Sequence, residues 1–184
     1  AYQVQLHCQQ QNIAFHLIQT EKQAFGLVNS YQIVSKMGVD RWLAMLAAYS
    51  ALRRGCAVMS AGSALTADWL DAQGRHLGGL IAPGRARMAA SLHRDLAQVL
   101  CSSELPFTEY NQDLGRTTES CCNVGIQAMM TGFMMQVISY DKDSPIWLAG
   151  GDSDAMLSLC ANEHKHRVKK VNNIVLEGLA IALP

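Results

Sequence analysis

The sequence predicts an α/β protein with a mixed sheet flanked by helices. Three short apolar runs, at residues 56–61, 64–71 and 76–81, follow one another with glycine-containing turns between them and predict an antiparallel meander. After the meander, helical patterns alternate with short apolar runs, which is the order of elements expected when helices cover a sheet. At 184 residues and 49% hydrophobic content, the chain is long enough for a sizeable core.

The remaining elements follow from periodicity and from helix stop signals. Before the meander, residues 13–20 are rich in β-favoured types and predict a strand, and a turn at 29–30 leads into an irregular stretch ending at Met37. Helical spacing then runs from Asp40 to a stop at Gly55. Beyond the meander we expect helices at 85–100, 118–140, 154–162 and 174–183, a polar loop around Pro106, and strands at 146–149 and 168–171.

Composition excludes several classes of partner. Lys and Arg number 15 and Asp and Glu number 15, so no basic surface for nucleic acid or anionic membrane is expected. The cysteines form no CxxC pair and no disulfide framework, and residues 1–11 do not resemble a signal peptide; a reducing cytoplasm fits both observations. The six cysteines are at positions 8, 56, 101, 121, 122 and 160.

The segment Ser120–Tyr140 is uncharged and as long as a membrane span. Within it, Asn123, Gln127 and Thr131 recur every fourth residue and form a polar stripe on a helix. We therefore predict an amphipathic helix of a protein that is not in a membrane. The nearby methionines are expected to serve core or dimer packing rather than chemistry; they are Met129, Met130, Met134 and Met135.

Seven short motifs, in order and in register, resemble the type III pantothenate kinase family. They are NSY (29–31), GVDRW (38–42), AGSALT (61–66), GRHLGGLIAPG (74–84), GRTTE (115–119), LAGGD (148–152) and LEGLAIAL (176–183). The resemblance implies a ribonuclease-H-like fold of the actin-like kinase superfamily. It implies a division into residues 1–54, the end of a first such domain, and residues 55–184, a second one.

By the same resemblance, the protein is expected to be a bacterial, cytoplasmic, homodimeric enzyme. Members of the type III pantothenate kinase family transfer the γ-phosphoryl group of ATP to the 4′-hydroxyl of pantothenate, giving 4′-phosphopantothenate in the first step of coenzyme A synthesis. The cofactors implied are ATP, Mg²⁺ and a monovalent cation, K⁺ or NH₄⁺.

Asp40 is the candidate catalytic residue. Phosphoryl transfer to an alcohol needs a carboxylate that orients the hydroxyl and accepts its proton, and the resemblance assigns that role to the aspartate of GVDR. An aspartate just before an apolar helix is also a common N-cap, and the local sequence by itself favours the cap. Both interpretations place Asp40 at a helix start.

The pantothenate site implied by the resemblance consists of Tyr31, Gly38, Val39, Asp40, Arg41 and Thr118. The planar guanidinium of Arg41 suits a carboxylate or phosphate, although it would equally form an ion pair with Asp40 or another neighbour. Tyr31 alone would more often be a packing residue. Thr118, as the first residue of a long helix, can offer its hydroxyl and the helix N-terminus to a ligand, or be a plain N-cap.

The candidate ATP-binding residues are Gly62, Ser63, Thr66, Gly150 and Gly151. Small residues and hydroxyls in the first turn of the meander can approach phosphates. The glycine pair fits a strand-to-helix turn near the adenosine, although ordinary loops use glycine as often. His164, His166 and Cys160 lie in a polar, lysine-rich segment, for which a solvated loop is expected rather than a metal site.

Two departures from the family pattern bear on activity. Ser60 stands where relatives carry the aspartate that binds the monovalent cation, so dependence on K⁺ or NH₄⁺ through this position is not expected. The family's DxGNT segment, which holds magnesium and ATP phosphates, does not occur in these 184 residues, and we expect it to precede Ala1 in the natural protein. The alternatives are a noncatalytic regulatory or interaction protein derived from the family, or a different actin-like kinase.

Overall fold

A five-stranded mixed sheet forms the centre of the computed structural model, which describes residues 2–95 and 113–183. The strands are β3 (Cys56–Ala61), β4 (Ala64–Leu70), β5 (His76–Pro83), β6 (Ile146–Ala149) and β7 (Val168–Lys170), in the order β5-β4-β3-β6-β7. The first three pair antiparallel, and β6 and β7 run parallel to β3. The predicted α/β class and the meander are confirmed.

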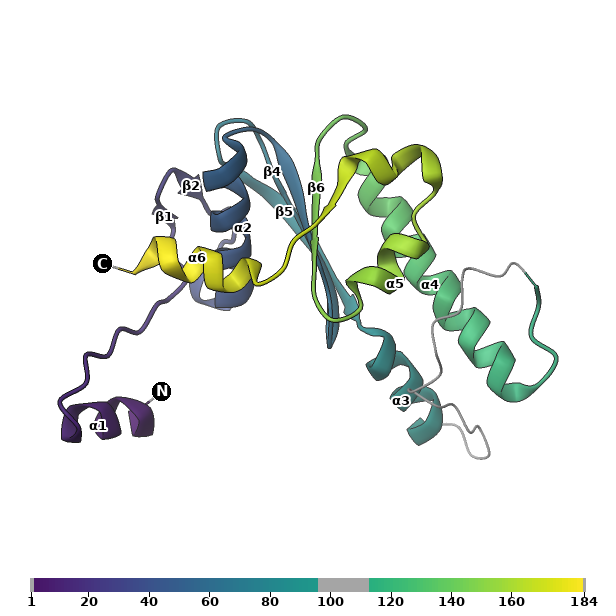
Figure 1. Ribbon diagram of the computed structural model, residues 1–184, viewed down its shortest axis with the longest axis horizontal. Helices are drawn as coiled ribbons and strands as arrows, with labels where there is room; N and C mark the ends of the chain where they lie inside the picture. Colours follow the sequence, from purple (N-terminus) through teal and green to yellow (C-terminus); the bar gives the residue numbers. More distant parts are fainter. Residues whose placement is uncertain (1, 96–112, 184) are drawn as a thin grey trace.

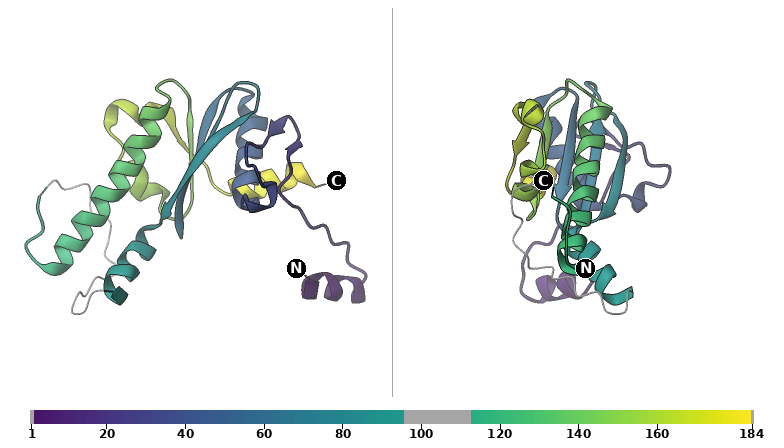
Figure 2. Two further views of the ribbon diagram at one scale, coloured as in Figure 1. Left: turned by 180° about the vertical axis from the view of Figure 1, so that it is seen from behind. Right: turned by 90° about the vertical axis from the view of Figure 1, so that its right-hand side faces the viewer.

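Helices cover both faces of this sheet and make three layers (Figures 1 and 2). On one face lie α2 (Val39–Leu52) and α6 (Ile174–Ala182), and on the other lie α3 (Arg85–Asp95), α4 (Thr118–Tyr140) and α5 (Ser153–Ser158). The arrangement is the ribonuclease-H-like unit expected from the sequence. Residues 96–100 of the predicted helix 85–100, and the loop around Pro106, lie outside the described residues.

Alternation along the strands assigns each side chain to one of two cores. Met59 and Leu65 point into the core under α4, whereas Val58 belongs to the core under α2. Successive residues of a strand point to opposite faces, so the polar residues Thr66 and Asp68 share the α2 face. These two polar residues of β4 can therefore contribute to a site on the α2 face of the sheet.

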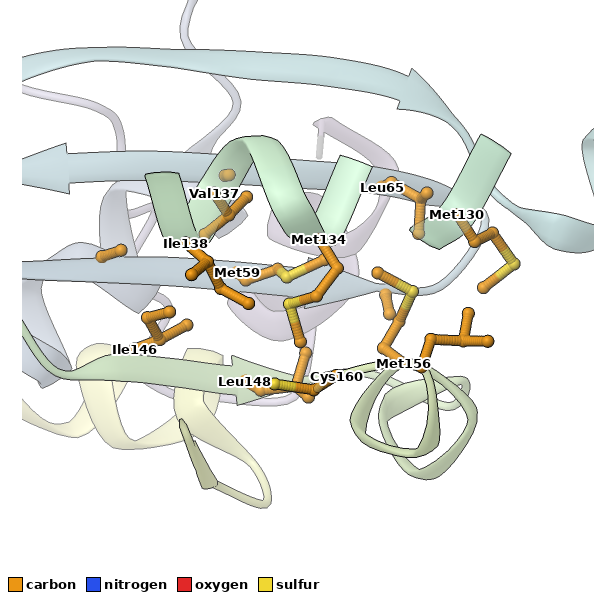
Figure 3. Close-up of a cluster of buried hydrophobic side chains, with 14 of the residues drawn as sticks. Met59, Leu65, Met130, Met134, Val137, Ile138, Ile146, Leu148, Met156 and Cys160 are labelled. Carbon is orange, nitrogen blue, oxygen red and sulfur yellow. The ribbon is translucent and has the colours of Figure 1, made fainter. Parts of the chain in front are cut away.

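Figure 3 shows the core beneath α4, where Met130 and Met134 are fully buried against the sheet. Met129 and Met135 lie on the opposite side of the same helix and are exposed. By length and composition α4 is the one described helix that would suffice to cross a membrane. Gln127, in the middle of the polar stripe, is buried beside the core.

Helices α2 and α6 approach each other closely because of one glycine. A Cβ built on the buried Gly178 would lie 2.0 Å from the carbonyl oxygen of Leu43. No side chain fits at that crossing, so glycine is required there. Ile174, at the start of α6, is held against α2 and closes the layer over the sheet.

The N-terminal region is less embedded than the sheet. Helix α1 (Tyr2–Gln10) has no buried residue, and together with the extended chain that follows it stands apart from the layers (Figure 1). The strand predicted at residues 13–20 is wrong: the segment is extended but pairs with no described strand. β-favoured residues form a strand only where a partner is available.

After this arm come a two-stranded ribbon, β1 (Gln23–Ala24) and β2 (Leu27–Val28), and a short 3₁₀ helix, η1 (Val34–Lys36). A second 3₁₀ helix, η2 (Asn162–Arg167), follows α5, where the sequence predicted one helix over 154–162. The domain boundary expected after residue 54 falls between α2 and β3, and it stays a prediction.

Candidate active site at the start of helix α2

The NSY motif forms a turn that presents two side chains to the sheet. Asn29 is fully buried, and its Oδ1 accepts a hydrogen bond from the backbone N–H of Tyr31 at 2.9 Å. Its own backbone N–H donates to the carbonyl of Lys22. An asparagine that closes a turn in this way fixes the residues after it. Ser30 and Tyr31 are thereby held beside β5.

Arg41 lies behind this turn, and its guanidinium is hydrogen-bonded to the carboxylate of Asp68. Its Nε and Nη2 donate to the two oxygens of Asp68 at 2.9 and 2.5 Å, and its Nη1 donates to the hydroxyl oxygen of Tyr31 at 2.7 Å. Arg41 and Asp68 are 7% and 2% exposed. The expected ion pair of Arg41 therefore exists, but its partner is Asp68 on β4 and not Asp40.

The electrostatics of Arg41 follow from this pairing. Burial alone lowers the pKa of the guanidinium, but the hydrogen bonds and charge of Asp68, with a smaller contribution from Tyr31, outweigh burial and raise the pKa. The side chain is thus a permanent cation whose charge is largely balanced within the protein. The bidentate hydrogen bonding to Asp68 fixes the orientation of the guanidinium.

Asp40, one residue earlier, has the opposite environment. It is exposed, and its carboxylate makes no hydrogen bond to any described residue. The N-cap of α2 is Gly38, without a side-chain cap bond, so the interpretation of Asp40 as an N-cap is wrong. Asp40 lies in the first helical turn, where free backbone N–H groups favour a negative charge.

Gly38 makes room for that carboxylate. A Cβ at position 38 would stand 2.5 Å from Oδ1 of Asp40. We expected Gly38 to allow a ligand to approach the backbone, and the structure adds this intramolecular reason for glycine. Val39, also placed in the candidate pantothenate site, is exposed beside Asp40.

A small cavity of about 30 Å³ joins Asp40 to the sheet. Ser60 and Thr66, which are cross-strand partners on β3 and β4, line it together with Arg41 and Asp68. Ile174 and Val175 of α6 close the other side. Ser60, the position of the family's cation-binding aspartate, therefore faces the candidate base with a neutral hydroxyl.

The candidate ATP-binding residues meet at one end of the sheet, where the parallel strands β3 and β6 finish. Gly62 and Ser63 form the turn after β3, and Gly150 and Gly151 follow β6, which runs parallel to β3 beside it. A Cβ on Gly150, whose φ is +103°, would lie 2.1 Å from the carbonyl oxygen of Ala61. The two turns are therefore in contact. The small cavity lined by Thr66 and Asp40 lies at the same end of the sheet.

Thr118 is not brought to this site within one chain. It is the exposed first residue of α4, and the first turns of that helix extend away from the sheet on the face opposite α2 (Figure 1). The N-cap is Thr117, whose hydroxyl oxygen accepts the backbone N–H of Ser120 at 3.1 Å. The hydroxyl of Thr118 is thus not used as the cap.

No metal centre is formed by the described residues. Within 2–95 and 113–183, no group of three or more His, Cys, Asp or Glu side chains lies close enough to hold an ion. Asp68 already binds Arg41, which leaves Asp40 as the carboxylate with free oxygens at the small cavity. One carboxylate does not make a magnesium site by itself, because the ion also needs water and nucleotide phosphate oxygens as ligands.

His164 and Cys160 line a separate cavity of about 810 Å³ between α4, α5 and η2. It lies where α4 ends and η2 leads into β7, at the end of the sheet where β6 and β7 begin, opposite to Gly150 and Gly151. Burial raises the pKa of the Cys160 thiol, with Lys165 and Arg167 acting in the opposite direction. The two side chains thus take no part in the candidate active site.

Sequence reasoning missed Asp68, His76 and Gly79. The alternation of β4 contained the signal for Asp68, since a carboxylate in the middle of a buried strand needs a partner. His76 could be found only through the pairing of β5 with β4, because its partner is eight residues away along the chain. Gly79 matters because it has no side chain: a Cβ there would collide with Asp68 and Arg41, and no sequence pattern marks such a position.

Comparison with known proteins identifies the family. Residues 1–140 match the family model described as type III pantothenate kinase. A curated protein of that name from Marinobacter nauticus is 39% identical over 158 residues, covering 84% of this chain and 62% of its own length. Another, from Ectopseudomonas mendocina, is 30% identical over 172 residues and covers 90% of this chain and 67% of its own length.

Among solved structures, a Campylobacter jejuni protein described as a Baf family transcriptional activator is similar with a TM-score of 0.59. It is 18% identical, and the match covers 82% of this chain and 65% of that one, so it supports the fold alone. The chain spans less than two thirds of the length of the Marinobacter relative. By the family model and these relatives, the chain belongs to the type III pantothenate kinase family.

Proposed function

We propose that the chain contributes the acceptor side of an ATP-dependent kinase that converts pantothenate to 4′-phosphopantothenate, the first step of coenzyme A synthesis. The observation that carries the proposal is an exposed Asp40, without a hydrogen-bond partner among the described residues, at the same small cavity as the Arg41 that contacts Tyr31, in a chain of this family. No observation favours the alternative of a noncatalytic regulatory protein.

Asp40 has the geometry and environment of a hydroxyl-orienting base. As the 4′-oxygen of pantothenate bonds to the γ-phosphorus of ATP, the bond from that phosphorus to the β,γ-bridging oxygen breaks, and ADP leaves. The proton of the 4′-hydroxyl passes to the Asp40 carboxylate. The exposed position of Asp40 in the first turn of the helix leaves its carboxylate accessible for this task.

Arg41 and Tyr31 are proposed to hold the carboxylate of pantothenate. Arg41 already donates to Asp68 and to the oxygen of Tyr31, but both Nη atoms carry a second N–H. Since the Tyr31 oxygen accepts from Arg41, its own O–H can donate outward. Together these donors form a fixed surface for an anionic group, with Gly38 and Val39 beside it.

ATP is proposed to lie at the end of the sheet that carries the two glycine turns. Gly62, Ser63 and Thr66 would face the phosphates, and Gly150 and Gly151 the adenosine. Their closeness to Asp40 around the small cavity supports this placement. Mg²⁺ is expected to accompany the nucleotide, as in phosphoryl transfer generally, and no step above depends on how the ion is held.

A homodimer is proposed to complete the pantothenate site with Thr118. This residue is exposed on the face opposite α2, so it would reach an Asp40 only in a second copy. The exposed Met129 and Met135 on α4 supply apolar surface for association. We also propose a cytoplasmic location, which suits the free thiols of the five described cysteines, Cys8, Cys56, Cys121, Cys122 and Cys160.

The test is identification of the product made by the full-length natural protein. With ATP, Mg²⁺ and pantothenate, phosphorus NMR and mass spectrometry should show one new phosphate monoester on the 4′-oxygen together with ADP. A panel of other small alcohols, sugars and acetate serves as the control for acceptor class. Transfer to a sugar or to acetate, with none to pantothenate, would contradict the proposal.

A further inference from the structure

Two buried polar side chains behind the proposed acceptor site have no part in the reaction described above. Asp68 and His76 are 2% and 3% exposed. His76 places its Nε2 at 2.9 Å from Oδ1 of Asp68 and its Nδ1 at 2.9 Å from the hydroxyl oxygen of Ser30. Buried polar groups that form a complete network fix one geometry, whereas an incomplete network costs stability.

The chemistry of the groups fixes the donor between His76 and Asp68, and the direction of the Ser30 contact follows from the tautomer of the ring. The carboxylate of Asp68 only accepts, so the His76 Nε2 carries the hydrogen. In the neutral ring Nδ1 then accepts, and the Ser30 hydroxyl donates to it. One oxygen of Asp68 thus receives two donors, from Arg41 and His76, and the other receives Arg41 Nε.

His76 also supports the second donor of the proposed carboxylate site. Its ring stacks on Tyr31, with ring centres 6.0 Å apart and an interplanar angle of 27°. The guanidinium of Arg41 lies 5.6 Å from the centre of the same Tyr31 ring. Tyr31 is therefore held by Arg41 through its hydroxyl and by His76 through its ring.

Gly79 provides the space in which Arg41 and Asp68 form their two hydrogen bonds. It is the cross-strand partner of Asp68, and a Cβ at this position would lie 2.4 Å from Asp68 Oδ1 and 2.5 Å from Arg41 Nη2. Any side chain here would separate the two charges. The GRHLGG stretch thus supplies both the histidine and the gap that the network requires.

We propose that Asp68 and His76 are positioning residues, which hold Arg41 and Tyr31 in the orientation that binds the carboxylate of the acceptor. The proposal rests on the proposed function of the site. Asp68 fixes the plane of the guanidinium and balances its charge, so the second N–H groups on Nη1 and Nη2 are held in place before the ligand arrives. Such preorganisation acts on acceptor binding rather than on the phosphoryl transfer itself.

The experiment compares pantothenate with its alcohol analogue, in which the carboxylate is replaced by a hydroxymethyl group. In full-length protein, Asp68→Asn and His76→Asn should raise KM for pantothenate by about tenfold or more, the loss expected when a charged hydrogen bond is misaligned. KM for the analogue should stay within about twofold, because it lacks the group that the network serves. Asp143→Asn and His164→Gln, at the opposite end of the sheet, are the matched controls.

His76→Gln is the rescue variant. Its amide N–H can reach the Asp68 oxygen from the position of Nε2, whereas the shorter side chain of His76→Asn cannot. We expect His76→Gln to keep KM for pantothenate within about threefold of wild type. If Asp68→Asn does not fold by circular dichroism, this histidine pair decides the question, since it leaves the Arg41–Asp68 hydrogen bonds in place.

Three results would overturn the proposal: equal losses for both acceptors, no change in either, or a lower KM for pantothenate. The last would mean that Asp68 competes with the acceptor for Arg41. Nitrogen-15 NMR provides a measurement without substrate, and it should find hydrogen on Nε2 of His76 in the wild type and a displaced Arg41 Nε resonance in Asp68→Asn. An intact network in a protein that does not phosphorylate pantothenate would reject the proposed function alone.

Discussion

Asp40 and Arg41 are neighbours in the chain with opposite environments, and the division of labour at the site depends on that contrast. The Arg41 side chain is drawn under the helix to Asp68, whereas Asp40 remains at the surface without a described partner. An ion pair between the two would have neutralised the base. By giving Arg41 another carboxylate, the fold leaves Asp40 available for a hydroxyl group.

Ser60 leads to a prediction about monovalent cations. A serine supplies a neutral oxygen to the small cavity, where an aspartate would supply a charge. Turnover of the full-length protein should therefore be the same, within about twofold, in sodium and potassium buffers of equal ionic strength. Activity that collapses in sodium and returns with potassium would contradict this prediction, and Ser60→Asp provides the comparison in which dependence should appear.

At this scale the sequence was informative about the identity of residues and less informative about their partners. The motifs singled out Tyr31 and Arg41, which the structure places in hydrogen-bonding contact. They did not name Asp68, which only the alternation of β4 marks, and they could not reveal the role of His76, because its contact with Asp68 depends on the register between β4 and β5. Their roles in a site remain proposals.

At the scale of elements, the turn between α4 and β6 is tied together by Asp141. Hydrogen bonding from the Ser144 side chain lowers its pKa, opposed by burial and assisted by the backbone N–H groups of Asp143 and Ser144 and by the charge of Arg167. Arg167 also donates to the backbone carbonyls of Asp141 and Ser144. This small network fixes the point at which the chain enters the central sheet.

The sign of the resulting pH dependence follows from that direction. Because the pKa of Asp141 is lower in the folded protein than its ordinary value of 3.8, its contribution to stability is complete above that value. It is lost as the pH falls through the lower, folded-state pKa. Asp141→Asn should reduce the urea midpoint at about pH 7, and its difference from wild type should shrink in strongly acidic buffer. A difference that grows on acidification would contradict the assignment.

The crossing of α2 and α6 gives a second prediction for the elements. Gly178→Ala places a methyl group against the Leu43 backbone, which cannot move aside as a side chain would, and should destabilise the fold by about 1–3 kcal/mol. Gly132→Ala in α4, where a Cβ meets nothing within 4 Å, is the matched control and should be neutral or stabilising by up to about 1 kcal/mol. Equal effects in chemical denaturation would show that the crossing is looser than described.

Elements with strong periodicity and clear turns were predicted well, as in the meander and in the long helix at 118–140. The strand expected at 13–20 failed because strand formation depends on a partner, which local composition does not reveal. The polar stripe predicted on the helix does not show which neighbour it meets, and Gln127 within it is buried. Periodicity shows which residues share a face and not which neighbour that face meets.

At the scale of the whole molecule, the sheet separates the two groups of proposed pantothenate residues. Asp40, Arg41 and Tyr31 belong to the α2 face, while Thr118 begins the helix on the other face. A single chain therefore offers an incomplete set. Two copies related by symmetry would supply both groups to each site.

Mixed dimers test this arrangement. Asp40→Asn and Thr118→Val subunits, each inactive alone, should recover about one quarter of wild-type activity when combined at random, since half of the dimers carry one intact site out of two. If Thr118 acted within its own chain, no combination would restore activity. Sedimentation of a monomer at micromolar concentration would likewise contradict the dimer.

The central claim is that Asp40 accepts the proton of the pantothenate hydroxyl, and single-turnover phosphoryl transfer measures it most directly. In rapid-quench experiments on the full-length protein, Asp40→Asn should slow transfer by about a hundredfold or more while ATP and pantothenate still bind. Asp143→Asn, a matched change of an exposed aspartate at the far end of the sheet, should be unaffected. Transfer at the wild-type rate in Asp40→Asn would contradict the account.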